Sequence, residues 1–130
     1  MRNRPYLKYL KQVISGIWHP GQDSRFNMLN TFKDWYDKNR SELKSLFDDI
    51  EIKSSPTVRT SMDKASSWIE FSNNIILGNL TVWDTGECDL VIISPNSGEQ
   101  LLFEYRESSN TKELENNLDS LVEKTKRLAL

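Results

Sequence analysis

Apolar residues recur every three or four positions in two segments of the amino-terminal half, which is the spacing of one helix face. The first segment spans residues 5–17 and ends at a Trp-His-Pro-Gly turn, because proline and glycine both resist continuing a helix. The second segment begins near Asp23 or Ser24, either of which can cap a helix, and its apolar stripe continues to Ile50. We predict one long helix here, or two nearly collinear helices that meet near Asn39.

The pattern changes after residue 54. Residues 54–64 are polar, contain a proline and indicate a loop or an irregular edge strand. Four segments rich in alternating or β-branched residues follow, joined by short turns that contain asparagine or glycine. At the first of these turns, Asn73-Asn74, we expect a positive φ because asparagine tolerates it. The four segments predict a four-stranded antiparallel meander sheet, with strands at residues 67–71, 75–83, 88–94 and 101–106.

The last segment returns to helical spacing. Asn110 can cap this helix, and Glu113 three residues later completes a capping-box pattern. A narrow apolar stripe follows, made of Leu114, Leu118, Leu121, Val122 and Leu128. The order of amino-terminal helices, strands and a carboxy-terminal helix predicts a single α+β domain over residues 1–130, with the helices packed on one face of the sheet.

Composition and charge narrow the class of protein. The 130 residues, 37% hydrophobic and 28% charged, are typical of one globular domain. Residues 1–21 contain four basic and no acidic side chains, whereas residues 84–123 contain ten acidic and two basic ones. Such an acidic segment repels phosphate backbones and attracts basic proteins, so we expect no direct nucleic-acid partner. The alternative, that the acids only keep the domain soluble, stays open at this point.

Targeting signals and cysteine usage point to one compartment. No apolar run approaches the roughly 20 residues of a membrane span, so no membrane partner is expected. The amino terminus lacks the continuous apolar stretch of a signal peptide. A single cysteine excludes an internal disulfide and fits a reducing compartment. We therefore expect a cytoplasmic protein.

Few side chains have the pattern of a catalytic or metal site. The one histidine, His19, lies in a turn without a nucleophile motif beside it, and it is interpreted as a surface or capping residue. Cys88 lies between two acids in a predicted strand, where its pKa is expected to be high and its thiol unreactive. The five glycines form no phosphate-binding loop. We expect no enzyme, no catalytic residue, no cofactor and no metal.

The hairpin around Gly86 is the strongest candidate for partner binding. It has a tryptophan and several acids around a tight glycine turn, a combination that suits a protein interface. Alternation along the strand leaves open whether Trp83 faces the helices or the solvent. Together with acids of the neighbouring strand, the predicted partner-binding residues are Trp83, Asp84, Glu87, Asp89, Glu99, Glu104 and Glu107.

This sequence resembles the TriTu-type immunity proteins of bacterial polymorphic toxin systems, such as contact-dependent growth inhibition and Rhs-like systems. The resemblance lies in the Trp83-x-x-Gly86-Glu87-x-Asp89 hairpin, the Gly98-Glu99 turn and the Phe103-Glu104-Tyr105 strand. The helix at Glu113-Leu114 and the upstream run from Phe32 to Arg40 fit as well. The resemblance covers about residues 26–128, and residues 1–21 are interpreted as an amino-terminal extension.

The resemblance implies a small cytoplasmic protein that binds and neutralises the carboxy-terminal domain of a cognate toxin. We expect this toxin to be a basic nuclease whose active site or substrate channel is covered, because nucleases carry positive charge to hold phosphates. One alternative is a protein-binding adaptor or chaperone-like module without a toxin. Another is a small enzyme that uses clustered carboxylates.

Overall fold

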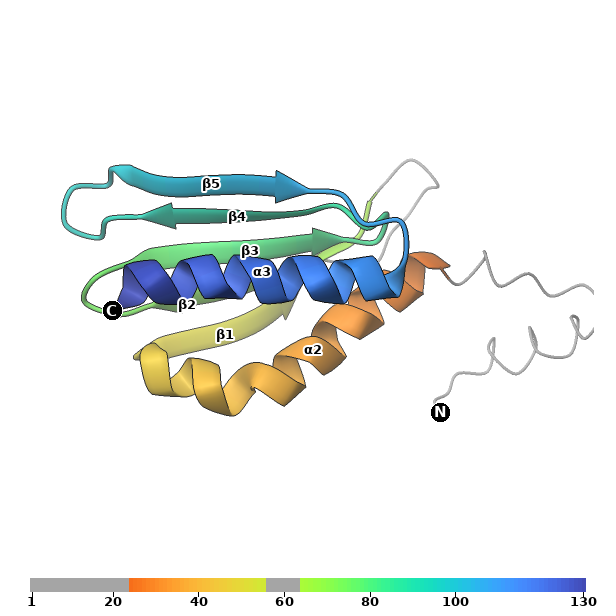
Figure 1. Cartoon of the computed structure of the whole chain (residues 1–130), viewed down its shortest axis with the longest axis horizontal. Coiled ribbons are helices and arrows are strands. Elements are labelled where there is room, and N and C mark those ends of the chain that lie inside the picture. The colour runs from red at the N-terminus through yellow and green to blue at the C-terminus, as the bar shows by residue number, and fades with distance from the viewer. Residues whose placement is uncertain (1–23, 56–63) are drawn as a thin grey trace, which may run out of the picture.

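A five-stranded antiparallel sheet lies at the centre of the molecule, with its strands in the order β1-β2-β3-β4-β5 (Figure 1). The computed structural model describes residues 24–55 and 64–130. Its elements are α2 (Ser24–Leu46), β1 (Asp49–Ser54), β2 (Ser66–Ser72), β3 (Leu77–Trp83), β4 (Cys88–Ile93), β5 (Gln100–Arg106) and α3 (Thr111–Ala129). The sheet is a meander, because each strand pairs with the next one along the chain. The α+β class is confirmed.

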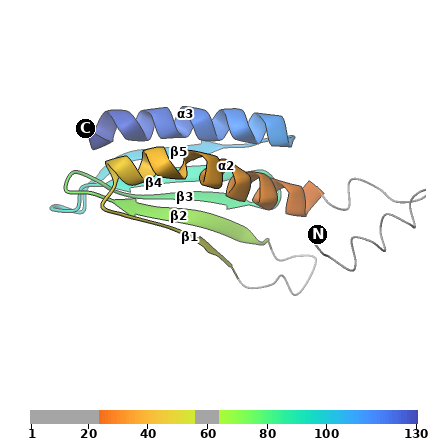
Figure 2. The ribbon, with the colours of Figure 1, turned by 90° about the horizontal axis from the view of Figure 1, so that it is seen from below.

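Both described helices cover the same face of the sheet, and the opposite face carries no described element (Figure 2). The strands show the alternation that this arrangement requires, since buried and partly exposed residues follow one another along β2, β3 and β4. The fully buried side chains on the covered face include Ile69, Val82, Leu90 and Ile92. They pack against the apolar stripes of α2 and α3 to form one core.

α2 is one continuous helix through Asn39, so its apolar stripe belongs to a single helix. The Asn39 side-chain amide donates to the carbonyl oxygen of Trp35, one turn back, at 2.8 Å. Trp35 in turn donates from its indole nitrogen to Asp119 of α3 at 2.9 Å, which fixes the two helices to each other. Phe32 is completely buried between these layers.

The sheet has five strands, one more than the sequence pattern predicted. The helix ends at Leu46 and the chain enters β1, so Ile50 belongs to a strand and not to the helical stripe. The alternation of Ile50 and Ile52 with charged neighbours is the strand signal. It was hidden because Ile50 also lies three residues after Phe47, at helical spacing.

Asparagine side chains accept backbone hydrogen bonds at two places, the β2–β3 turn and the start of α3. The turn at Asn73-Asn74 is present, but no non-glycine residue in the described part of the chain has a positive φ. The positive φ expected there was therefore wrong. Instead, the Asn73 side-chain oxygen accepts from the backbone N–H groups of Ile75 and Ile76 at 2.8 and 2.9 Å. Asn110 caps α3 as predicted, accepting from the N–H of Glu113 at 2.8 Å.

Several predictions fall outside the described residues. They are the helix at residues 5–17, the turn that contains His19, the Asp23 cap and most of the polar segment 54–64. Among the helices that the structure does describe, none is long and apolar enough to cross a membrane.

Candidate functional site: the open face of the sheet

The face of the sheet that points away from α2 and α3 is a candidate surface for binding a partner. We call it the open face. Because side chains alternate along each strand, it is formed by the residues that lie between the buried ones. On β3, β4 and β5 these residues are Leu77, Asn79, Thr81, Trp83, Asp89, Val91, Ile93, Leu101, Phe103 and Tyr105. The structure therefore places Trp83 on the open face, with Val82 beside it in the core.

The β3–β4 turn closes one end of the open face and fixes Trp83 and Glu87 side by side. The N–H of Trp83 donates to the carbonyl oxygen of Glu87 at 2.9 Å, and Gly86 turns the chain with a φ of 98°. The Glu87 carboxylate accepts from the hydroxyl of Thr85 and from Lys64 Nζ, the latter at 2.9 Å. The first of these bonds is the main reason why the pKa of Glu87 is lowered. Lys64 Nζ also lies 5.9 Å from the centre of the Trp83 ring.

Two further acids join this end of the open face from β4 and the end of β5. Asp89 is opposite Tyr105 in the β4–β5 register, so both side chains are on the open face. Burial raises the pKa of Asp89 above its ordinary value. The Tyr105 hydroxyl donates to Glu107 at 3.2 Å, and desolvation together with this bond raises the pKa of Tyr105.

Trp83, Glu87, Asp89, Tyr105 and Glu107 thus form one cluster, which we call the acidic-aromatic patch. Four of its five members were predicted partner-binding residues. Tyr105 was not, although the alternation of Phe103, Glu104 and Tyr105 already placed it on the opposite side of β5 from Glu104. The signal that could have found it is the register of the meander, which sets Tyr105 beside Asp89. The patch combines rigid aromatic surface with carboxylates, so it is suited to bind cationic side chains of a partner.

Three of the predicted residues, Asp84, Glu99 and Glu104, lie outside this patch. Asp84 is buried, with 4% of its surface exposed, and it accepts from the backbone N–H of Ala65 at 3.2 Å. Its own N–H donates to the Ala65 carbonyl oxygen at 2.9 Å, so this residue fixes the chain that enters β2. Glu99 is exposed in the β4–β5 turn, at the far end of the sheet from Trp83.

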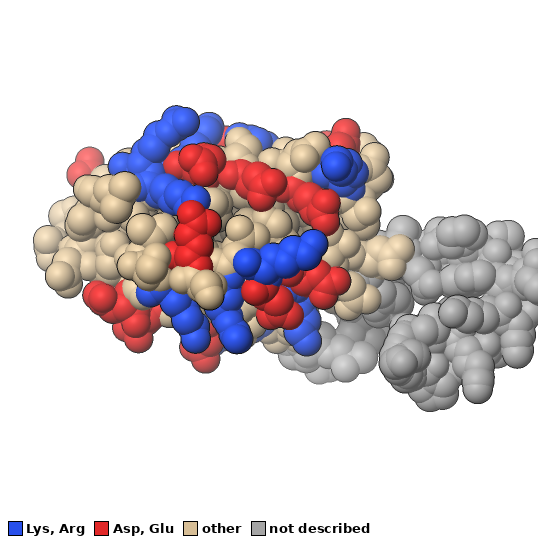
Figure 3. Space-filling model, turned by 60° about the horizontal axis from the view of Figure 1, so that its bottom comes forward, with Lys and Arg blue, Asp and Glu red and all other residues tan. Residues whose placement is uncertain are grey.

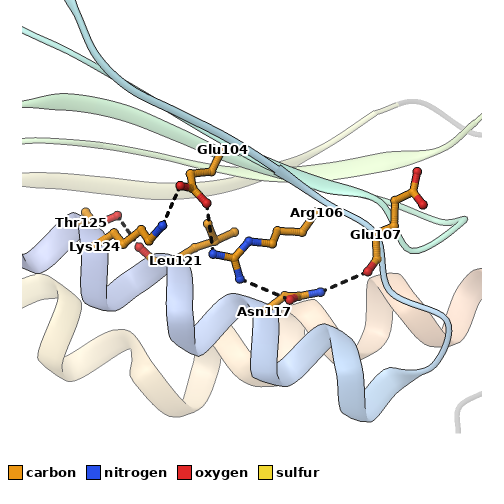
Figure 4. Close-up of polar contacts among 7 residues, drawn as sticks. All are labelled: Glu104, Arg106, Glu107, Asn117, Leu121, Lys124 and Thr125. Atoms are coloured by element: carbon orange, nitrogen blue, oxygen red, sulfur yellow. Dashed lines mark hydrogen bonds and ion pairs between the residues drawn. The ribbon is translucent and has the colours of Figure 1, made fainter.

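Glu104 lies on the helix side of β5, away from the acidic-aromatic patch (Figure 4). Its carboxylate accepts from Lys124 of α3 at 2.6 Å and from Arg106 at 3.0 Å. The Lys124 bond is the largest cause of its lowered pKa. Arg106 also donates to Asn117 of α3 at 3.4 Å, whereas the Glu107 carboxylate is turned away from that helix. Glu104 thus connects β5 to α3, and the sequence did not show which face it occupies.

The other end of the open face is apolar. Leu77 of β3 and Leu101 and Phe103 of β5 are 42%, 41% and 51% exposed, which is unusual for large hydrophobic side chains on one face of a sheet. A shallow depression of about 280 Å³ lies between Leu77, Val91 and Ile93. None of these strand residues was among the predicted partner-binding residues.

The side of the molecule that shows the helices has a different surface. There, acidic side chains form a row with basic side chains on both sides of it (Figure 3). Many are paired, for example Lys126 of α3 with Glu42 of α2 at 2.6 Å. Charges that neutralise one another in this way attract a charged partner weakly. The open face is therefore the better candidate for recognition.

The structure also shows the surroundings of the residues that were considered as nucleophiles or metal ligands. Cys88 is completely buried on the helix side of β4, and burial raises the pKa of its thiol to about 11. A thiol in this state is a poor nucleophile at neutral pH. Within residues 24–55 and 64–130, no group of three or more His, Cys, Asp or Glu side chains is placed to hold a metal ion. His19 lies outside the described residues.

The sequence matches a known protein family. The family described as immunity protein TriTu matches residues 30–124. This chain belongs to the TriTu immunity protein family. The match includes all five strands and most of both helices, so the open face of this TriTu protein lies entirely within the shared region. A search of curated proteins found no match.

Proposed function

We propose that this TriTu protein binds the carboxy-terminal domain of a cognate toxin through the open face and neutralises it in the cytoplasm without a chemical step. The observation that carries this proposal is the acidic-aromatic patch at the β3–β4 turn. Aromatic side chains on a rigid strand give contact area at little entropic cost, and the carboxylates add charge complementarity. The family assignment supports the role, because immunity proteins are the partners of toxins.

The patch favours a basic partner. Lys64 already lies near both the Glu87 carboxylate and the Trp83 ring, so the geometry of a bound cation is present within the chain itself. A lysine or arginine of the toxin can take an equivalent position. We propose a nuclease as the toxin, since nucleases use basic residues to bind phosphates, and these residues are then the natural target of the patch.

Neutralisation by this route is steric and electrostatic. A standard protein interface buries about 1,600 Å² in total, and a sheet face of five strands can supply one side of it. Covering the substrate channel of a nuclease excludes the nucleic acid, and the carboxylates of the patch occupy the places of its phosphates. The apolar end of the open face would supply the dry centre of the interface.

Co-expression with the toxin domain encoded by the neighbouring gene tests this proposal. Wild-type protein should restore growth and co-purify with the toxin. Glu87→Lys should weaken binding by about 2–5 kcal/mol, because it places like charges together at the interface. The control is Asp34→Lys, which makes the same charge change at an exposed position of α2.

Melting temperature and toxin affinity are measured for both variants. We expect the melting temperature of Asp34→Lys to stay close to wild type, since exposed charges contribute little to stability. That of Glu87→Lys should fall slightly, because the half-buried carboxylate loses its bonds from Thr85 and Lys64. Loss of affinity in Glu87→Lys alone supports an interface at the patch. Equal loss in both variants would mean that only net charge matters, and unchanged affinity in both would place the interface elsewhere. Failure of the wild-type protein to bind the toxin would overturn the proposed function.

A further inference from the structure

The outer edge of β5 has main-chain groups available for a further strand. β5 is the last strand of the sheet, and no described strand pairs with its outer side. Figure 1 shows it at the rim, with neither described helix lying beyond it. Two observations identify which groups point outward. The N–H of Ser108 donates to the carbonyl oxygen of Gly86, and the β4–β5 register continues this pairing to Arg106 with Cys88 and Glu104 with Leu90.

Hydrogen-bonded pairs alternate along an antiparallel ladder. Glu104 and Arg106 therefore direct their N–H and C=O groups toward β4. Phe103 and Tyr105, which lie between them, direct theirs away from the sheet. The same two residues place their side chains on the open face, where they are 51% and 49% exposed. Main-chain hydrogen-bonding groups and apolar side chains are thus presented together.

The two edges of the sheet differ in how they are protected. At β1, the residues that alternate with the two isoleucines are Asp49, Glu51 and Lys53, and charges of this kind discourage pairing with another chain. At β5, the corresponding positions on the open face are Leu101, Phe103 and Tyr105. An edge strand whose open-face side chains are apolar, with no charge or proline among them, is a template for an additional strand.

Acids flank this apolar edge at both ends. Glu99 precedes β5 and Glu107 follows it, and both are exposed. We propose, on the basis of the function proposed above, that β5 binds an extended segment of the toxin as a sixth strand of the sheet. The segment should carry apolar side chains at alternate positions and a lysine or arginine near each end. Main-chain bonds would provide affinity, and the flanking charges would set the register.

A second copy of this chain is a poorer occupant. Antiparallel pairing of two β5 strands over their full length is centred on Phe103. It places Glu99 of one copy opposite Glu107 of the other, and this occurs at both ends of the pair. Like charges directly opposite each other destabilise a strand pair. A basic segment is attracted to the same positions.

Amide hydrogen exchange of the full chain, followed by NMR, tests the pairing. In the free protein the amides of Phe103 and Tyr105 should exchange fast, and those of Glu104 and Arg106 should exchange slowly. Addition of the toxin domain encoded by the neighbouring gene should slow exchange at Phe103 and Tyr105 by tenfold or more. Unchanged exchange in the complex would overturn the proposal. Slow exchange in the free protein would also overturn it, because the edge would then already be occupied.

A matched pair of variants separates the main chain from the side chain. Phe103→Ala removes the ring and keeps the N–H, whereas Phe103→Pro removes both. Proline is tolerated on an edge strand where the N–H points outward, so both variants should fold. We expect Phe103→Pro to bind the toxin about tenfold more weakly than Phe103→Ala.

Equal affinity of the two variants would overturn strand addition while leaving the proposed function intact, provided that wild type binds. If wild type does not bind the toxin, the proposed function and this inference both fail. Should Phe103→Pro not fold, the exchange measurement on wild type decides alone. A concentration-dependent dimer with slow Phe103 exchange in the absence of toxin would favour the second copy and overturn the proposal.

Discussion

The covered face and the open face of the sheet are made by the same strands, yet their side chains have opposite properties. On the covered face Ile69, Leu80 and Leu90 are almost completely buried by the two helices. On the open face the neighbouring residues include Trp83, Phe103 and carboxylates. Because alternate positions of one strand serve the two faces, stability and recognition are encoded in separate side chains. Substitutions can therefore change one property and leave the other nearly intact.

The stability of the fold does not explain the exposed apolar side chains at one end of the open face. Exposed leucine and phenylalanine on one face of a sheet lower solubility and favour association. In a chain that belongs to an immunity protein family, a partner that covers these residues accounts for them. The covered face is already buried in the free protein, whereas we propose that the apolar end of the open face is buried only in the complex.

The largest expected effect comes from a matched pair of phenylalanine substitutions. Phe32→Ala removes a completely buried ring from the core and should lower the free energy of unfolding by about 3–5 kcal/mol. Phe103→Ala removes a half-exposed ring from the open face and should change it by no more than about 0.5 kcal/mol. Urea denaturation of both variants measures the difference. A large loss for Phe103→Ala would show that the open face is part of the stabilising core.

Two turn glycines provide the second contrast. Gly86 and Gly98 both have a positive φ, so replacing either by alanine should cost about 1–2 kcal/mol in backbone strain. At Gly86 an added Cβ would also lie 2.2 Å from the carbonyl oxygen of Ser108, whereas at Gly98 it would meet nothing within 4 Å. Gly86→Ala should therefore be clearly more destabilising than Gly98→Ala by thermal melting. Equal losses would indicate that the segment at Ser108 moves freely to make room.

The fold was largely predictable from periodicity. Alternation with a period of two separated Ile69 and Phe71 from Trp68 and Glu70, and the structure confirms this division. β1 was missed because two periods overlap around Ile50. Local pattern cannot choose between them, since the choice depends on pairing with β2, which is distant in sequence.

The site was predictable only in part. A tight turn at Gly86 was expected, and Gly86 turns the chain there with a positive φ. Alternation placed residues of one strand on opposite faces but did not show which face the helices cover. Whether Trp83 and Glu104 are exposed or face the helices depended on which face is covered. The two side chains lie on opposite sides of the sheet. Asp84 was grouped with the exposed acids, but its bond to Ala65 depends on a residue 19 positions away.

Titration of Glu104 gives the third contrast, because this acid is paired with α3. Its pKa is lowered in the folded state, so it stabilises the fold above its ordinary pKa and loses this contribution as the pH falls through the lowered value. Glu104→Gln should be less stable than wild type by about 1 kcal/mol at pH 7. The two proteins should converge as the pH falls below the lowered pKa of Glu104, which lies under the ordinary glutamate value of about 4.3. Glu99→Gln, at an exposed turn, is the control and should match wild type throughout. A gap that persists at low pH would mean that the glutamine disturbs packing.

The smallest expected effect concerns the cation within the acidic-aromatic patch. Lys64→Ala removes the ammonium group that lies beside Glu87 and Trp83, and it should change stability little because the Lys64 side chain is 48% exposed. If the patch receives a basic residue of the toxin, this variant should associate about two to three times faster at low salt. The advantage should disappear as salt screens the patch, since the Debye length falls to about 3 Å at 1 M. Stopped-flow association at several salt concentrations measures this, with Lys33→Ala at an exposed position of α2 as the matched control. Slower association of Lys64→Ala would mean that Lys64 itself contacts an acidic part of the toxin, and the charge assignment of the patch would then have to be reversed.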